Sequence, residues 1–161
     1  TDETLTKLFH DGLFAIFYLA PFNYHRVHMP VDGKLLQTIW VPGKLFAVNP
    51  KMAAYVPNLF SRNERLIAIF STSVGKVAII LVGAFIVGSI HTAWGASNVG
   101  QNKIITQSFS SGMTLAKGIE IGFFQLGSTV IILFEKNTIT WDSHLQVDTA
   151  VSMGQAIASV V

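Results

Sequence analysis

Short apolar runs rich in β-branched and aromatic residues recur along the chain, separated by glycine, proline and asparagine. Runs of this kind are typical of buried or half-buried strands. Helical spacing is confined to two short segments, 2–9 and 49–56, and the Ser-, Asn- and Gly-rich segment 95–112 predicts a mobile loop around a two-residue strand at 104–105. We therefore expect a mainly β (β-rich α+β) fold, an antiparallel β-sandwich or barrel-sandwich-like core with a few short helices. The predicted strands are 13–19, 34–41, 64–72, 77–81, 85–94, 118–124, 129–134, 139–141 and 144–147.

The most apolar stretch of the chain, 78–96, is nearly long enough to cross a bilayer as a helix, which takes about 20 apolar residues. It is interrupted by three glycines and is rich in β-branched residues. These features favour two buried strands that break near Gly83 over a spanning helix.

Composition narrows the classes of partner. The 161 residues predict one domain, 1–161. Only 12% of the residues are charged, against about 25% in typical soluble domains, so the surface is expected to contact lipid or further protein. The net charge of +2 without a Lys/Arg cluster argues against nucleic acid and allows weak attraction to anionic lipid. The absence of cysteine excludes disulfides and thiolate metal sites.

Two histidines stand close together in the segment Tyr24-His25-Arg26-Val27-His28-Met29-Pro30. Imidazoles titrate near neutral pH and can move protons, and two of them three residues apart share a face if the segment is helical. Spacing supplies no third ligand for a metal, so no metal site is predicted. The alternative is a pair of hydrogen-bonded histidines in a turn.

The dipeptide Gly127-Ser128 lies at the start of the apolar run 126–134. Leu126 and Val130 stand where the nucleophile elbow of α/β-hydrolases has glycines, which argues against an ordinary serine hydrolase. Ser128 is therefore either a structural hydroxyl or a nucleophile that attacks the carbonyl group before it. Glu120, between two glycines, is either a general acid or base or a carboxylate that holds the glycine turns.

These motifs together resemble the phosphatidylserine decarboxylases, which are pyruvoyl-dependent enzymes that make phosphatidylethanolamine. The Leu-Gly-Ser-Thr form of the serine motif is similar to the bacterial, long-chain branch of that family. The resemblance covers nearly the whole chain and rests on residues 18–21, 24–30, 56–60, 62–65, 82–84, 87–90, 117–118, 120, 122, 124 and 126–131.

The resemblance implies a site and a mechanism. Ser128 would attack the carbonyl of Gly127, with His28 as its base, and split the chain into 1–127 and 128–161. Ser128 would become a covalent pyruvoyl group, the only cofactor implied. That group would form a Schiff base with the amine of phosphatidylserine, and His25 would supply a proton after CO2 leaves. Tyr24 and His25 are the implied substrate contacts.

The resemblance also implies partners and a location. It implies a homodimer bound peripherally to an anionic membrane, on the cytoplasmic face of the bacterial inner membrane. It further implies an aspartate that orients His28 from an Asp-Gly turn well upstream. Neither Asp11 nor Asp32 occupies that place, so we expect the chain to be a piece of a longer protein.

Two alternatives remain open from the sequence. One is a non-catalytic β-sandwich binding or carrier module in which Ser128 stays a plain serine. The other is an integral membrane protein that spans the bilayer at 77–96.

Overall fold

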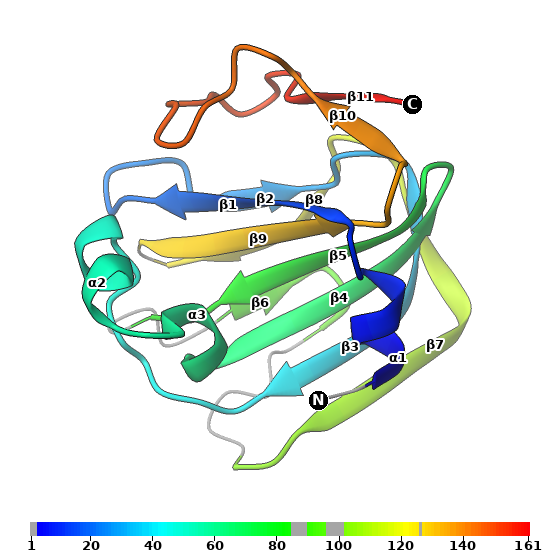
Figure 1. Ribbon diagram of the computed structural model, residues 1–161. Helices are drawn as coiled ribbons and strands as arrows, with labels where there is room; N and C mark the ends of the chain where they lie inside the picture. Colours follow the sequence, from blue (N-terminus) through cyan, green and yellow to red (C-terminus); the bar gives the residue numbers. More distant parts are fainter. Residues whose placement is uncertain (1–2, 85–89, 96–101, 126) are drawn as a thin grey trace.

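The computed structural model describes residues 3–84, 90–95, 102–125 and 127–161, which form antiparallel sheets and a few short helices (Figure 1). The helices are Glu3–Leu8 (α1), Pro50–Tyr55 (α2) and Leu59–Arg62 (α3). The strands are Leu13–Leu19 (β1), Arg26–His28 (β2), Gly33–Val41 (β3), Arg65–Thr72 (β4), Gly75–Val82 (β5), Ile90–Thr92 (β6), Ile105–Leu115 (β7), Glu120–Phe124 (β8), Ser128–Phe134 (β9), Ile139–Trp141 (β10) and Ala158–Val160 (β11). The prediction of a mainly β, antiparallel fold is confirmed.

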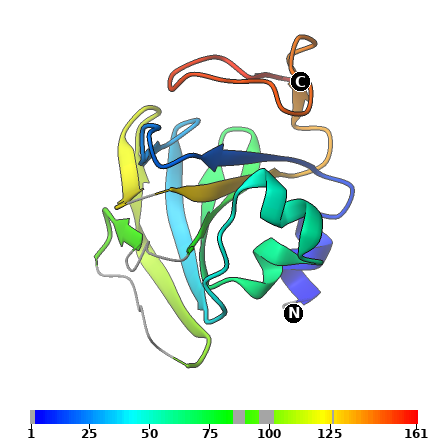
Figure 2. The ribbon, with the colours of Figure 1, turned by 90° about the vertical axis from the view of Figure 1, so that its left-hand side faces the viewer.

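The main sheet has six strands in the order β1-β9-β5-β4-β3-β7, and a smaller sheet has the order β2-β8-β6. Figure 2 shows β6 and β8 on the side of the molecule opposite to the three helices. One core of buried side chains joins the two sheets, with Phe70 and Ile79 from the main sheet and Ile121 from the small one. The main sheet is thus a middle layer, with the small sheet on one face and α1 on the other.

Strand β9 occupies an inner position that determines the place of residue 128. It pairs with β1 from Leu19↔Ser128 to Leu13↔Phe134, and with β5 on its other side. Its sequence is β-branched and apolar, as a strand buried between two neighbours requires. The predicted strand 129–134 is confirmed and extended by one residue to Ser128.

The segment after β6 was wrongly predicted as a loop around a two-residue strand. The structure has an eleven-residue strand, β7, paired with β3. Strand β7 is the last strand of the main sheet, so many of its Ser, Thr and Gln side chains face solvent and the run lacks the apolar signature of an inner strand. Gly112, at φ 61°, lies where the β3–β7 register shifts. The part of the prediction at 96–101 lies outside the described residues.

A second prediction, of a strand at 144–147, was also wrong. Those residues form turns, and β10 instead pairs with β11 near the C-terminus. The alternation in 144–147 is short, and Asp142 accepts a hydrogen bond from the backbone N–H of His144, which favours a turn over a ladder.

The apolar stretch 77–96 begins as a strand of the main sheet. Strand β5 ends at Val82, directly before Gly83, as predicted, and residues 85–89 lie outside the described part of the chain. Among the residues that the structure does describe, no helix has the length and hydropathy needed to span a bilayer.

Asn63 ties the helical segment to the main sheet. Its side chain is completely buried and bonds three backbone groups: it accepts from the N–H of Phe46 (3.2 Å) and donates to the carbonyls of Phe46 (2.8 Å) and Gly83 (2.9 Å). A buried amide in such a set of bonds is costly to lose, because its partners remain buried without water.

We expect Asn63→Ala to lower the free energy of unfolding by about 3 kcal/mol, since it leaves buried backbone groups unpaired. Urea unfolding followed by tryptophan fluorescence measures this loss. Asn102→Ala, at an exposed position, is the matched control and should change stability by less than about 0.5 kcal/mol. Equal effects of the two substitutions would contradict the anchoring role of Asn63.

Candidate functional site

Ser128 is completely buried where β9 begins, opposite Leu19 of β1. Its Oγ has no hydrogen-bond partner among the described residues. A buried hydroxyl normally forms at least one hydrogen bond, so this oxygen departs from the pattern of a purely structural serine. The carbonyl group that a self-cleaving serine would attack is that of Gly127, the residue directly before Ser128.

Gly127 lies tightly against the turn that follows β1. A Cβ atom added there would come within 3.2 Å of the Leu19 carbonyl oxygen and of two ring carbons of Pro21. Contacts that short are tight, so a larger residue at 127 would require Leu19 and Pro21 to give way by a few tenths of an ångström. Because Gly127 has no side chain, nothing of its own shields its carbonyl group from the Ser128 hydroxyl.

His25 is linked to this step through Pro21. Its Nε2 lies 3.1 Å from the carbonyl oxygen of Pro21, and its own carbonyl accepts from the N–H of Phe124 (3.1 Å), near the end of β8. Its Nδ1 is buried and has no partner among the described residues. Because a carbonyl oxygen only accepts, Nε2 carries the proton, and Nδ1 is left as an unused acceptor.

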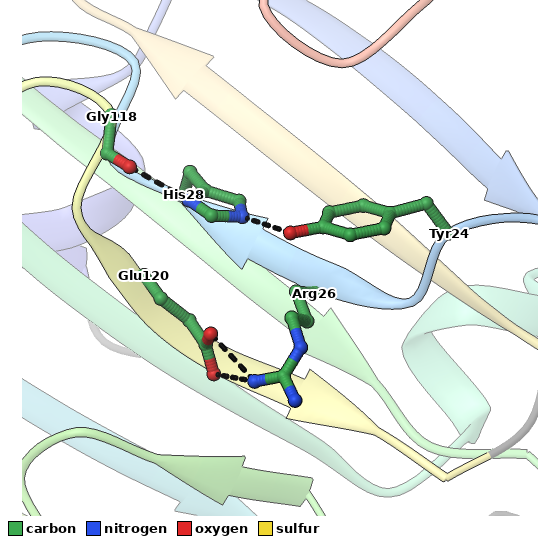
Figure 3. A network of polar contacts seen from close by, with 5 residues as sticks. All are labelled: Tyr24, Arg26, His28, Gly118 and Glu120. Carbon is green, nitrogen blue, oxygen red and sulfur yellow. Dashed lines mark hydrogen bonds and ion pairs between the residues drawn. The ribbon is translucent and has the colours of Figure 1, made fainter.

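His28 makes hydrogen bonds through both of its ring nitrogens (Figure 3). Nδ1 lies 2.7 Å from the carbonyl oxygen of Gly118, and Nε2 lies 2.8 Å from the hydroxyl of Tyr24. The Tyr24 ring is also stacked on the imidazole, with centroids 5.7 Å apart. The Gly118 carbonyl requires the proton on Nδ1, so Nε2 is the basic nitrogen and accepts from Tyr24.

Arg26 and Glu120 form an ion pair beside the hydrogen-bonded residues Gly118, His28 and Tyr24 (Figure 3). One guanidinium nitrogen donates to both carboxylate oxygens, at 2.8 and 2.7 Å, and the guanidinium also lies 5.4 Å from the ring centroid of Phe123. The hydrogen bond and the charge of Glu120 raise the pKa of Arg26 above its ordinary value. The Glu120 carboxylate therefore joins β8 to β2 through the Arg26 side chain, which is a different contact from the one expected at the glycine turns.

The structure changes the geometry expected for the two histidines. The segment is a strand with a bulge between Val27 and His28, so the helical arrangement with a shared face is wrong. Neither imidazole bonds the Ser128 hydroxyl. His25 is connected to the Gly127-Ser128 step through Pro21, whereas His28 is occupied by Tyr24 and Gly118. No cluster of three metal-ligating side chains occurs within the described residues.

Sequence reasoning missed the two carbonyl groups that orient the imidazoles, those of Pro21 and Gly118. Side-chain motifs carry no sign of a carbonyl contact between residues 28 and 118. One signal was available for Gly118: it is one of the two glycines beside Glu120 for which turns were expected, and its φ of 83° lies in the region that favours glycine. Tyr24 was expected to contact substrate, and here it bonds His28.

Comparison with known proteins identifies the family. The family model for phosphatidylserine decarboxylase matches residues 1–159. The chain belongs to the phosphatidylserine decarboxylase family. Relatives named phosphatidylserine decarboxylase proenzyme include those of Pasteurella multocida and Mannheimia succiniciproducens, 53% and 50% identical over 161 residues. Both alignments cover 98% of this chain and 55% of the relative. A relative of the same name from Coxiella burnetii is 45% identical, with 99% and 57% covered.

The chain therefore spans about half the length of the curated relatives it matches. Within this phosphatidylserine decarboxylase segment lie the serine motif, both histidines and the carbonyl groups that orient them. The family resemblance expected from the sequence is confirmed.

The hydrogen bonds predict opposite tautomers for the two neutral histidines, Nε2–H for His25 and Nδ1–H for His28. Two-dimensional ¹⁵N NMR of the side chains, at a pH where both rings are neutral, distinguishes the two forms. Tyr24→Phe should leave His28 in the Nδ1–H form, because the Gly118 carbonyl remains, and should shift the Nε2 resonance. The same tautomer at both rings would contradict the orienting role of the carbonyls.

Proposed function

We propose that this chain is the core of a phosphatidylserine decarboxylase that matures by cutting itself between Gly127 and Ser128. The observation that carries the proposal is the buried, unpartnered Oγ of Ser128 next to a glycine carbonyl. Membership of the family, whose relatives are named proenzymes, supports it.

The residues present fit a pyruvoyl group at position 128. A pyruvoyl group has a ketone where serine has its α-amine and a methyl group where serine has its hydroxymethyl group. The buried hydroxyl that is lost makes no bond that the conversion would break. Gly127 leaves no side chain between the new chain end and the turn at Pro21. The unpartnered Nδ1 of His25 adds a second unsatisfied polar atom, connected to the same step through Pro21.

Self-cleavage uses groups of this chain. Ser128 Oγ loses its proton and attacks the carbonyl carbon of Gly127, the C–N bond breaks, and an ester forms. Elimination then removes the Cα proton of residue 128 and releases Gly127 as a carboxylate. Hydrolysis of the remaining enamine releases ammonia and leaves the pyruvoyl group on the chain 128–161.

His28 is the proposed base for this reaction. Its hydrogen bonds support this role, because they leave Nε2 as the nitrogen that can accept a proton. The Gly118 carbonyl accepts from Nδ1–H, so the lone pair of Nε2 is free to accept a proton. In this structure it accepts a hydrogen bond from the Tyr24 hydroxyl. The imidazole must leave Tyr24 to reach Ser128. The upstream aspartate implied by the family would stabilise the imidazolium once it has taken the proton.

In the mature enzyme, the pyruvoyl group supplies a ketone conjugated to a carbonyl, which accepts the electron pair left by the departing carboxylate. His25 is the proposed proton donor: its Nδ1, which has no competing partner, would first take up a proton and then deliver it, while Nε2–H stays on the Pro21 carbonyl. Tyr24 and His25 are the proposed substrate contacts. The proposed substrate is phosphatidylserine, converted to phosphatidylethanolamine and CO2.

The proposed setting is an anionic membrane, with the protein bound peripherally on the cytoplasmic face of the bacterial inner membrane as a homodimer. The low charged fraction, 12%, supports contact with lipid or with further protein. The net charge of +2 supports weak attraction to anionic lipid.

Self-cleavage predicts two polypeptides, 1–127 and 128–161, in the purified protein. Intact mass spectrometry should find both masses, and the second polypeptide should carry a ketone that reacts with hydroxylamine. Ser128→Ala should remain whole, whereas the matched control Ser143→Ala, at an exposed position, should cleave like the parent. A folded parent chain that stays whole would contradict self-cleavage of this segment.

The two histidines should separate maturation from decarboxylation. His28→Ala should slow cleavage by at least about a hundredfold, the usual scale for loss of a general base. His25→Ala should still cleave but lose decarboxylation by a similar factor. A gel that follows cleavage and an assay of CO2 release from phosphatidylserine vesicles measure the two steps. The assigned roles are wrong if both variants mature and turn over normally.

A further inference from the structure

The Asp32 carboxylate bonds the turn whose carbonyl orients His28. Its Oδ1 accepts the backbone N–H of Lys117 at 2.6 Å. Lys117 directly precedes Gly118, whose carbonyl oxygen accepts from Nδ1 of His28 at 2.7 Å (Figure 3). This contact differs from the one implied for the upstream aspartate of the family, because Asp32 bonds a backbone group and not the imidazole.

The turn belongs to one of two connections between the sheets that are bonded to each other. Residues 29–32 lead from β2 to β3, and residues 116–119 lead from β7 to β8. Met29 joins the two connections through its backbone. Its N–H donates to the carbonyl of Ile119, and its carbonyl accepts from the N–H of Gly118, both at 2.9 Å. The two connections therefore hold each other as well as their strands.

The backbone at Asp32 is fixed by the strand that follows it. Gly33, the first residue of β3, pairs with Thr72 of β4 and with Leu115 of β7, since β3 lies between these two strands in the main sheet. Asp32 thus stands at a fixed strand end, opposite the place where β7 ends at Leu115. From there its short side chain reaches a backbone N–H just beyond the ladder, as aspartate commonly does in turns.

The direction of the Gly118 carbonyl depends on how this turn is held. A hydrogen bond of 3.1 Å from the N–H of Ile119 to the carbonyl of Ala116 closes the turn. Gly118 stands at its third position with φ 83°, the value that type II turns have there. Glycine itself restricts φ and ψ very little. The bond from Lys117 to Asp32 therefore restrains a peptide group that its own residue would leave free.

That carbonyl decides which nitrogen of His28 is basic. The hydroxyl of Tyr24 can donate to Nε2 or accept from it, so it is compatible with both tautomers of the imidazole. The Gly118 carbonyl can only accept, so it selects Nδ1–H and leaves the lone pair on Nε2. Loss of that contact would allow the Nε2–H form, in which the nitrogen proposed as the base has no lone pair to offer.

We propose that Asp32 is a positioning residue for His28. Its carboxylate fixes the turn at Lys117 and thereby holds the Gly118 carbonyl against Nδ1 of the imidazole. The consequence for self-cleavage rests on the function proposed above, in which His28 is the base, whereas the effect on the tautomer does not.

Substitutions at position 32 separate the hydrogen bond from the charge. Asp32→Asn keeps an acceptor oxygen for the Lys117 N–H and removes the negative charge, whereas Asp32→Ala removes both. Glu135→Ala is the matched control, because the Glu135 carboxylate also accepts a backbone N–H at 2.6 Å, that of Lys76 on β5. Asp32→Val, which also lacks an acceptor, replaces Asp32→Ala if far-UV circular dichroism shows that the alanine variant is unfolded.

The first measurement is the tautomer of His28, by two-dimensional ¹⁵N NMR of the side chains in a Ser128→Ala background that cannot cut itself. We expect Asp32→Ala to shift the imidazole from the Nδ1–H form toward the Nε2–H form. Asp32→Asn and Glu135→Ala should leave it in the Nδ1–H form. An unchanged tautomer in the Asp32→Ala protein would overturn the proposal. Equal shifts with Asp32→Asn or with Glu135→Ala would also overturn it, since the charge or a general loosening of the fold would then be responsible.

The second measurement is the rate of self-cleavage with Ser128 in place, followed on a gel. Asp32→Ala should slow cleavage by about fivefold, the scale set by the net free energy of one hydrogen bond, and Asp32→Asn should keep the parent rate. A tautomer shift without slower cleavage would support Asp32 as a positioning residue and overturn His28 as the base. A parent chain that stays whole would overturn self-cleavage, and the tautomers in the Ser128→Ala background would still decide the role of Asp32.

Discussion

The antiparallel pairing of β1 with β9 is the interaction on which the candidate site depends. It sets Leu19 opposite Ser128, so the serine begins a strand and its hydroxyl is buried. It also ends β1 where the chain turns through Pro21, whose ring packs against Gly127 and whose carbonyl holds His25. One ladder of backbone hydrogen bonds thus fixes the serine, the glycine before it and one imidazole relative to one another.

The second imidazole depends on the small sheet. Strand β2 pairs with β8, and the Arg26–Glu120 ion pair reinforces that contact across the two strands. An exposed pair of this kind contributes little stability by itself, so its effect is mainly to hold register. The register brings the Gly118 carbonyl to Nδ1 of His28, and His28 is oriented there by backbone geometry and Tyr24. The backbone of both histidines contacts β8, but their imidazoles are oriented by carbonyls from different parts of the fold, Pro21 for His25 and Gly118 for His28.

The inner strands could be predicted from the sequence because burial on both faces leaves an unbroken apolar signature, as in β5 and β9. The edge strand β7 could not, since its Ser- and Thr-rich face meets water and resembles a loop. The chemistry-bearing residues Ser128, His25 and His28 stood out as residue types, but their mutual arrangement did not. Their orientation comes from main-chain carbonyls and from a β-bulge, and neither leaves a trace in side-chain patterns. The family was evident because several motifs occur together along one chain.

The inner position of β9 has a consequence for the lifetime of the folded protein. A break before Ser128 would turn β9 into the first strand of a separate polypeptide, still flanked by β1 and β5. Removal of that polypeptide would split the main sheet and open its core, so the two pieces would stay together without a covalent bond. Once unfolded, however, they would have to find each other again by diffusion, and refolding would depend on concentration. Such a protein folds as one molecule only once, before the cut, and its native state is afterwards preserved by the slowness of unfolding.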